Sequence, residues 1–133
     1  MSERYIGLMS GTSLDGVDGV LADFSKGAIR VLADASAPFP PHLRTTFMAL
    51  NRSGPDELHR AALAGNELAG LYGQVVQALL TSSGCEARQV RAIGAHGQTV
   101  RHQPQAHGGS GYTLQINNPA LLAEMSGIAV VAD

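Results

Sequence analysis

The pattern of apolar and polar residues at the start of the chain predicts three consecutive strands. Apolar runs cover residues 5–9 and 17–24, and a short polar segment that contains glycine separates them. These two runs are expected to pair as a hairpin. A third apolar run, residues 29–37, follows the small polar turn at residues 25–27. The chain is therefore expected to open with three antiparallel strands.

Beyond residue 38 the spacing of apolar residues becomes helical. A proline is well tolerated in the first turn of a helix, so Pro41 suits the start of a helix that spans residues 41–51. From residue 56 to about 81, apolar residues recur on one helical face, and Gly84 is well placed to end this longer helix. The pattern then predicts strands at 90–95 and 112–116, a helix at 119–125 and a strand at 128–132. This order is typical of an α/β domain with a mixed sheet flanked by helices.

The sequence also predicts two loops and places three methionines in the core. Residues 96–99 are expected to leave the strand at 90–95 as a loop, and the glycine-rich residues 104–111 are expected to form a mobile loop. Met9, Met48 and Met125 are expected to fill the core, because methionine packs readily into irregular apolar spaces.

Composition narrows the class of protein. A chain of 133 residues, 44% of them hydrophobic, is long enough for one domain with its own core. The net charge is −2 and the nine Lys and Arg are scattered, which argues against nucleic acid and membrane partners. The single Cys85 excludes an intramolecular disulfide and fits a reducing compartment. With neither a signal peptide nor a long apolar stretch in the sequence, a cytoplasmic location is expected.

A first candidate site lies between the first two strands. It has the glycine, hydroxyl and carboxylate residues of a phosphate-binding turn: Gly11, Thr12, Ser13, Leu14, Asp15, Gly16, Val17 and Asp18. Gly11 permits a positive φ and a close approach of the backbone to phosphate oxygens. Asp15 and Asp18 could hold Mg²⁺ through water or orient a substrate hydroxyl. The segment lacks the lysine of a Walker A loop and the following helix of a dinucleotide fingerprint. An ordinary hairpin turn uses the same residue types, so that alternative stays open.

A second candidate site follows the predicted strand at 90–95. His96 and Gln98 lie where α/β sheets usually contact ligands, and they could hydrogen-bond a sugar or an acetamido group. Alternatively, His96 is satisfied by its own loop. Arg101 could bind a carboxylate or phosphate or be a solvated surface residue, and Asp133 could accept a sugar hydroxyl or simply end a strand.

A metal site built on histidine is a weaker alternative. His96, His102 and His107 lie close together in the sequence, but their spacing fits no common zinc pattern.

Three segments, taken in order, resemble one known family. They are residues 6–18 (IGLMSGTSLDGVD), residues 93–104 (IGAHGQTVRHQP) and residues 130–133 (VVAD). Together they are similar to the anhydro-N-acetylmuramic acid kinase family, over nearly the whole chain. The resemblance implies the first, ribonuclease-H-like domain of the sugar-kinase and actin-like ATPase fold. In that fold two such domains close on ATP, and the second is expected to be absent from residues 1–133.

The resemblance also implies a reaction. ATP and water would convert the amino sugar 1,6-anhydro-N-acetylmuramic acid to N-acetylmuramic acid 6-phosphate and ADP, with Mg²⁺, in peptidoglycan recycling. It implies that residues Gly11 to Asp18 form the ATP-phosphate loop, and that His96, Gln98, Arg101 and Asp133 lie on the substrate side.

The chain departs from the family pattern in two ways. Asn117 stands where a glycine is expected, and the sequence stops before the Phe-Arg that continues the third motif. The later glycine-rich segment with the aspartate that would activate water is not in the chain, so the catalytic residue is unknown and the 133 residues alone are expected to be inactive. A non-catalytic actin-like nucleotide-binding or assembly module is the alternative function, and an open sheet edge makes a homodimer possible.

Overall fold

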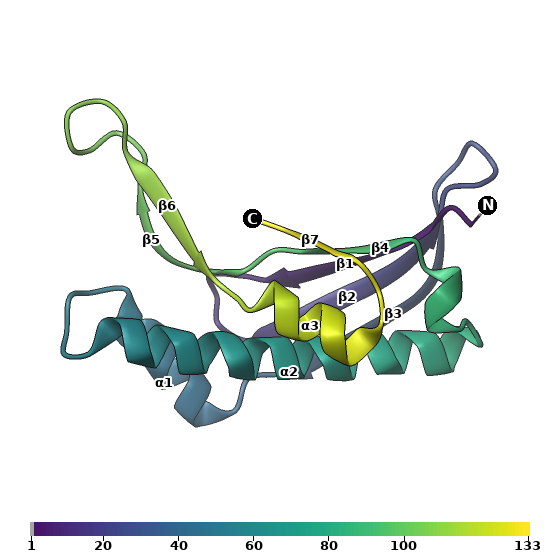
Figure 1. Ribbon diagram of the computed structural model, residues 1–133, viewed down its shortest axis with the longest axis horizontal. Helices are drawn as coiled ribbons and strands as arrows, with labels where there is room; N and C mark the ends of the chain where they lie inside the picture. The colour runs from purple at the N-terminus through teal and green to yellow at the C-terminus, as the bar shows by residue number, and fades with distance from the viewer. Residues whose placement is uncertain (1) are drawn as a thin grey trace.

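A five-stranded mixed sheet forms the centre of the computed structural model, which describes residues 2–133 (Figure 1). Its strands lie in the order β3-β2-β1-β4-β7. Their bounds are β1 (Arg4–Ser10), β2 (Gly16–Asp23), β3 (Arg30–Pro38), β4 (Ala92–Ala95) and β7 (Val130–Ala132). The first three strands pair antiparallel, whereas β4 pairs parallel to β1 and β7 pairs parallel to β4. The predicted mixed sheet with three antiparallel opening strands is therefore confirmed.

The three α-helices lie together on one side of this sheet (Figure 1). They are α1 (Pro41–Leu50), α2 (Glu57–Ser83) and α3 (Pro119–Ser126), and a short 3-10 helix η1 (Ala87–Gln89) follows α2. The helix α2 ends at Gly84, whose left-handed φ of 70° gives the glycine cap that the sequence predicted. Within residues 2–133, no helix covers the opposite face of the sheet.

The core lies between the sheet and α2. The inward-facing residues of β1, β2 and β4 alternate with exposed ones, as expected for strands with one buried face. The largest fully buried side chains include Tyr72, Phe47, Ile6 and Ile93. The prediction that three methionines lie in the core is wrong: Met9, Met48 and Met125 are 50%, 55% and 47% exposed. Their positions fall on the outer faces of the strand and helices, and a residue's hydrophobicity alone does not fix which face it occupies.

A separate two-stranded hairpin projects away from the main sheet (Figure 1). It consists of β5 (Gln98–Gln103) and β6 (Tyr112–Ile116), which pair antiparallel with a register shift between Thr99 and Arg101. The prediction of a loop at residues 96–99 is therefore wrong for Gln98 and Thr99, which begin β5. Residues 104–111 connect the two strands, so the glycine-rich segment is a hairpin connection.

No helix within residues 2–133 is both long enough and apolar enough to span a membrane.

Candidate functional site

The two candidate sites lie side by side at one edge of the sheet. Because β1 and β4 are parallel neighbours, their carboxyl ends reach the same edge, where ligands bind in open α/β sheets. Residues 11–18 follow β1, and His96 follows β4. His96 is tied to β1, the strand that leads into the first segment, since the His96 N–H donates to the Leu8 carbonyl oxygen at 3.0 Å. Asp133 follows β7, the next parallel strand, and completes the edge.

The turn at residues 11–14 is strained, but not where the sequence suggested. Gly11 does not have a positive φ; the residue that does is Leu14, with φ of 56°. A left-handed conformation costs a side-chain-bearing residue about 1–2 kcal/mol. Leu14 is nevertheless held there, because its side chain is buried in the core and its N–H donates to the Gly11 carbonyl at 3.2 Å. Strain of this kind concentrates at functional loops.

Gly16 is the glycine that the turn requires. A Cβ at this position would lie 2.3 Å from the Ala37 carbonyl oxygen of β3, far inside van der Waals contact. The pairing of β2 with β3 begins here, opposite Pro38, and the Phe39 N–H donates to the Asp15 carbonyl at 3.2 Å. The end of the turn is thus fixed against β3 by backbone contacts.

A hollow of about 360 Å³ opens beside this turn. Asp15 and Asp18 both line it, and both are exposed. Neither carboxylate takes part in an ion pair within residues 2–133. Ser36 of β3 also lines the hollow, directly opposite Asp18 in the strand register. The sequence around Ser36 gives no sign of a site. Only the pairing of β2 with β3 brings this residue beside Asp18.

The other residues of the turn contribute in different ways. Gly11, Ser13, Gly16 and Val17 line the hollow, with the Val17 side chain only 1% exposed in the core. Thr12 is exposed at the tip of the turn, outside the lining of the hollow.

The two carboxylates suit Mg²⁺ better than they suit a closed metal cage. Within residues 2–133 no group of three His, Cys, Asp or Glu side chains is placed to hold a metal ion, so the histidine site is not assembled. Mg²⁺, however, is usually bound by one or two carboxylates together with substrate phosphates and water. Asp15 and Asp18, facing one hollow without other partners, meet that requirement.

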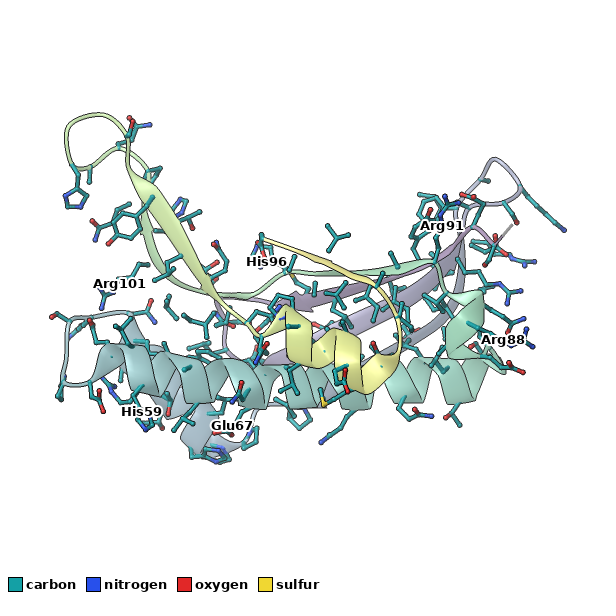
Figure 2. All side chains as sticks on the ribbon, in the orientation of Figure 1. His59, Glu67, Arg88, Arg91, His96 and Arg101 are labelled. Atoms are coloured by element: carbon teal, nitrogen blue, oxygen red, sulfur yellow. The ribbon has the colours of Figure 1, made fainter. Side chains whose placement is uncertain are left out.

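His96 and Asp133 come together at the ends of β4 and β7. The Asp133 Oδ2 lies 3.2 Å from the His96 Nε2, and the Asp133 Oδ1 accepts from the Gly97 N–H at 3.0 Å. The other ring nitrogen of His96, Nδ1, lies 2.6 Å from the Gly97 carbonyl oxygen. Both side chains remain partly exposed, at 38% and 42%. Figure 2 shows His96 beside the end of β7.

The two remaining substrate candidates have partners within the protein. Gln98 is 1% exposed; its Oε1 accepts from the Ser10 hydroxyl at 2.5 Å, and its Nε2 donates to the Thr99 carbonyl at 3.3 Å. It therefore ties the start of β5 to the end of β1.

Arg101 lies apart from His96, toward the start of α2 (Figure 2). Its guanidinium pairs with the Glu57 carboxylate and donates to the Leu50 carbonyl at 3.1 Å. The hydrogen bond with Glu57 raises the pKa of Arg101 above its ordinary value. The structure thus brings His96 and Asp133 together and leaves Arg101 at a distance from them.

Tyr72 also belongs to the candidate site, because it contacts His96. From the sequence alone it is one of the apolar residues on one face of the helix predicted from residue 56 to about 81. Its side chain is fully buried in α2, and its hydroxyl donates to the His96 carbonyl oxygen at 2.5 Å. A tyrosine on a buried helix face needs a partner for its hydroxyl, which is the signal that a reader of the sequence could have used.

Asn117, the departure from the family glycine, lies beside this region. A Cβ built on Gly97 would approach the Asn117 Cβ to 3.3 Å, so the two residues are neighbours. The Asn117 Oδ1 accepts from the Asn118 N–H at 2.8 Å, while its Nδ2 is buried without a partner in residues 2–133. The asparagine is accommodated, but at the cost of one unsatisfied donor.

The fold of the chain matches that of a solved structure. The structure matches the crystal structure of the ROK hexokinase from Thermus thermophilus with a TM-score of 0.52 at 16% sequence identity, over 98% of this chain and 34% of that chain. The sheet and the helices on one of its faces therefore have the fold of the matching part of that chain.

The sequence comparisons identify the family. The family model "Anhydro-N-acetylmuramic acid kinase" matches residues 3–133. The chain is 67% identical over 131 residues to the anhydro-N-acetylmuramic acid kinase of Variovorax paradoxus, and 62% identical over 133 residues to that of Ralstonia nicotianae. These matches cover 98% and 100% of this chain. The chain belongs to the anhydro-N-acetylmuramic acid kinase family, and it spans 35% of the length of these two relatives.

Proposed function

We propose that this chain contributes the phosphate-binding loop and part of the sugar site to an ATP-dependent kinase for 1,6-anhydro-N-acetylmuramic acid. The observation that supports this most directly is the shared edge of the sheet. There Asp18 lines one hollow of about 360 Å³ together with Asp15, and a second hollow of about 460 Å³ together with His96, which is paired with Asp133. A kinase requires this adjacency, because phosphate and acceptor must meet in line.

Residues Gly11 to Asp18 would hold the phosphates of ATP. Gly11, Ser13 and Gly16 line an open hollow, where the Ser13 hydroxyl and backbone N–H groups would donate to phosphate oxygens. Asp15 and Asp18 would hold Mg²⁺, at least partly through water. When bound, Mg²⁺ neutralises charge on the phosphates during transfer.

His96 and Asp133 would contact the sugar. Together they offer a ring nitrogen and a carboxylate, both partly exposed, to hydroxyl and acetamido groups. Gln98 and Arg101 could reach the sugar only by exchanging the protein partners that they now have. Their direct contact with substrate stays a prediction, and their present role is to hold the β5–β6 hairpin in place.

The rest of the catalytic site would come from a second domain. The base that activates water is expected to be an aspartate in that part of a full-length kinase, and the ATP-binding cleft would close between the two domains. Such an enzyme would work in the cytoplasm, where ATP is available. A homodimer through an exposed sheet edge also stays a prediction; Val31 on β3 and Val131 on β7 are 59% and 68% exposed.

A direct assay tests the proposal. A full-length kinase that contains residues 1–133 should convert ATP, water and the anhydro sugar to ADP and N-acetylmuramic acid 6-phosphate, detected by mass spectrometry. The 133-residue chain alone should give no turnover. Absence of product from the full-length protein would refute the substrate, and turnover by the isolated chain would refute the need for a second domain.

A further inference from the structure

One peptide group in the His96 region is held from both sides. The carbonyl of His96 and the N–H of Gly97 belong to the same planar peptide unit. Tyr72 donates to that carbonyl at 2.5 Å, and Asp133 accepts from that N–H at 3.0 Å. The Tyr72 hydroxyl and the Asp133 carboxylate therefore fix the plane of one peptide between them.

Without Tyr72, the Asp133 carboxylate alone would hold this peptide. Gly97 carries no side chain to restrict its dihedral angles, and the His96 carbonyl has no other hydrogen-bond partner among residues 2–133. The N–H of His96 is held by β1, so rotation would be confined to the 96–97 peptide. A rotation there would carry the Gly97 N–H away from the Asp133 Oδ1.

The hydroxyl is suited to this task because it keeps its proton. Burial in α2, and then the carboxylates of Asp133 and Asp18, raise the pKa of Tyr72 above its ordinary value. It therefore remains a donor across the physiological range. Its ring is locked in the core, fully buried, so the hydroxyl has a fixed position.

We propose that Tyr72 is a positioning residue for the sugar site: by fixing the 96–97 peptide it sets the orientation of the His96 imidazole and the Asp133 carboxylate. The proposal rests on the assignment of His96 and Asp133 to the sugar. It makes the long helix α2 a structural support for substrate recognition as well as a part of the core.

The first test is the substitution Tyr72→Phe in a full-length kinase that contains this chain. A single neutral hydrogen bond is worth about 0.5–1.5 kcal/mol, so the KM for the sugar should rise about two- to thirteenfold. The KM for ATP should stay within about twofold, because the turn at residues 11–18 is held independently. Val76→Ala is the matched control: Val76 is buried in the same helix and makes no hydrogen bond to His96. It should lower the melting temperature without raising the KM for the sugar.

The second test does not depend on the substrate. Amide hydrogen exchange measured by NMR should show the Gly97 N–H exchanging at least about tenfold faster in Tyr72→Phe than in the unaltered protein. The Ile93 N–H, which donates to the Ala129 carbonyl at 2.8 Å, should exchange at an unchanged rate. If Gly97 is equally protected in both proteins, the positioning role is overturned. If Gly97 exchanges faster but the enzyme does not act on the anhydro sugar, the positioning role holds and the assigned substrate falls.

Discussion

The two halves of the site are built in opposite ways. In the turn at residues 11–18, the carboxylates of Asp15 and Asp18 face an open hollow without protein partners, and Leu14 is held in a strained conformation. In the His96 cluster, by which we mean Tyr72, His96, Gly97 and Asp133, the side-chain polar groups are paired with one another or with the backbone. The turn can therefore accept a ligand that balances the negative charge of the two carboxylates. The cluster keeps its shape without a ligand.

The comparison makes its strongest prediction for Asp15. Asp15→Ala should lower the rate of phosphorylation by about 10²–10³-fold in a full-length kinase, because it removes a charge aimed at the phosphates and metal. The melting temperature should hardly change, since the carboxylate has no protein partner. Asp34→Ala, an exposed carboxylate on β3 outside the lining of the hollow, is the control. A near-normal rate in Asp15→Ala would show that the turn is an ordinary hairpin.

The backbone support of the turn gives the second prediction. Gly16→Ala should lower the free energy of unfolding by about 1–3 kcal/mol, because its Cβ would press on the Ala37 carbonyl. Chemical denaturation measures the loss. Gly94→Ala is the matched control: its Cβ would meet no atom within 4 Å, so stability should stay the same or rise slightly. Equal effects of the two substitutions would mean that the contact between β2 and β3 is not a rigid support.

Asp133 tests the cluster. Asp133→Ala should raise the KM for the sugar by about tenfold, because the Gly97 N–H and the His96 ring lose a charged partner. The KM for ATP should change much less. Steady-state kinetics with each substrate varied in turn separates the two. A larger effect on the KM for ATP would place Asp133 in the phosphate site. The site would then not divide into a phosphate half and a sugar half.

The smallest effect is expected for the ion pair that holds Arg101. Glu57→Gln should lower the melting temperature slightly at low salt and less at high salt, because dissolved salt screens the attraction within this partly exposed ion pair. The KM for the sugar should not change. A clear change would show that Arg101 acts on the substrate, and the sugar half of the site would then extend into the β5–β6 hairpin.

Much of the scaffold followed from the sequence. Hydrophobic periodicity and the glycine at position 84 predicted α2 and its end, and the alternating runs predicted the opening strands. The start of strand β5 was missed because the first of its two buried positions is occupied by a polar residue, Gln98, so the pattern there indicates a loop. Only the pairing with β6 makes that residue part of a strand.

The site was predicted as a set of residues but not as a set of contacts. The motifs located both halves, yet the positive φ fell on Leu14 and not on Gly11, because burial of the leucine side chain holds it there. The partner of Tyr72 could not be predicted, since it lies 24 residues later in the sequence and is a backbone carbonyl. Hydrogen bonds of this type depend on how elements pack, which periodicity does not specify.

The parallel pairing of β1 with β4 also has a consequence during protein synthesis. One edge of β1 finds its partner β2 within the first 23 residues, whereas the other edge waits for residues 92–95. A sheet of β1, β2 and β3 that forms before β4 is made would have an unpaired, mostly apolar edge, a known starting point for aggregation. The helix α2 is made before β4 and could cover one face of that early sheet, but the edge of β1 would stay open until β4 pairs with it.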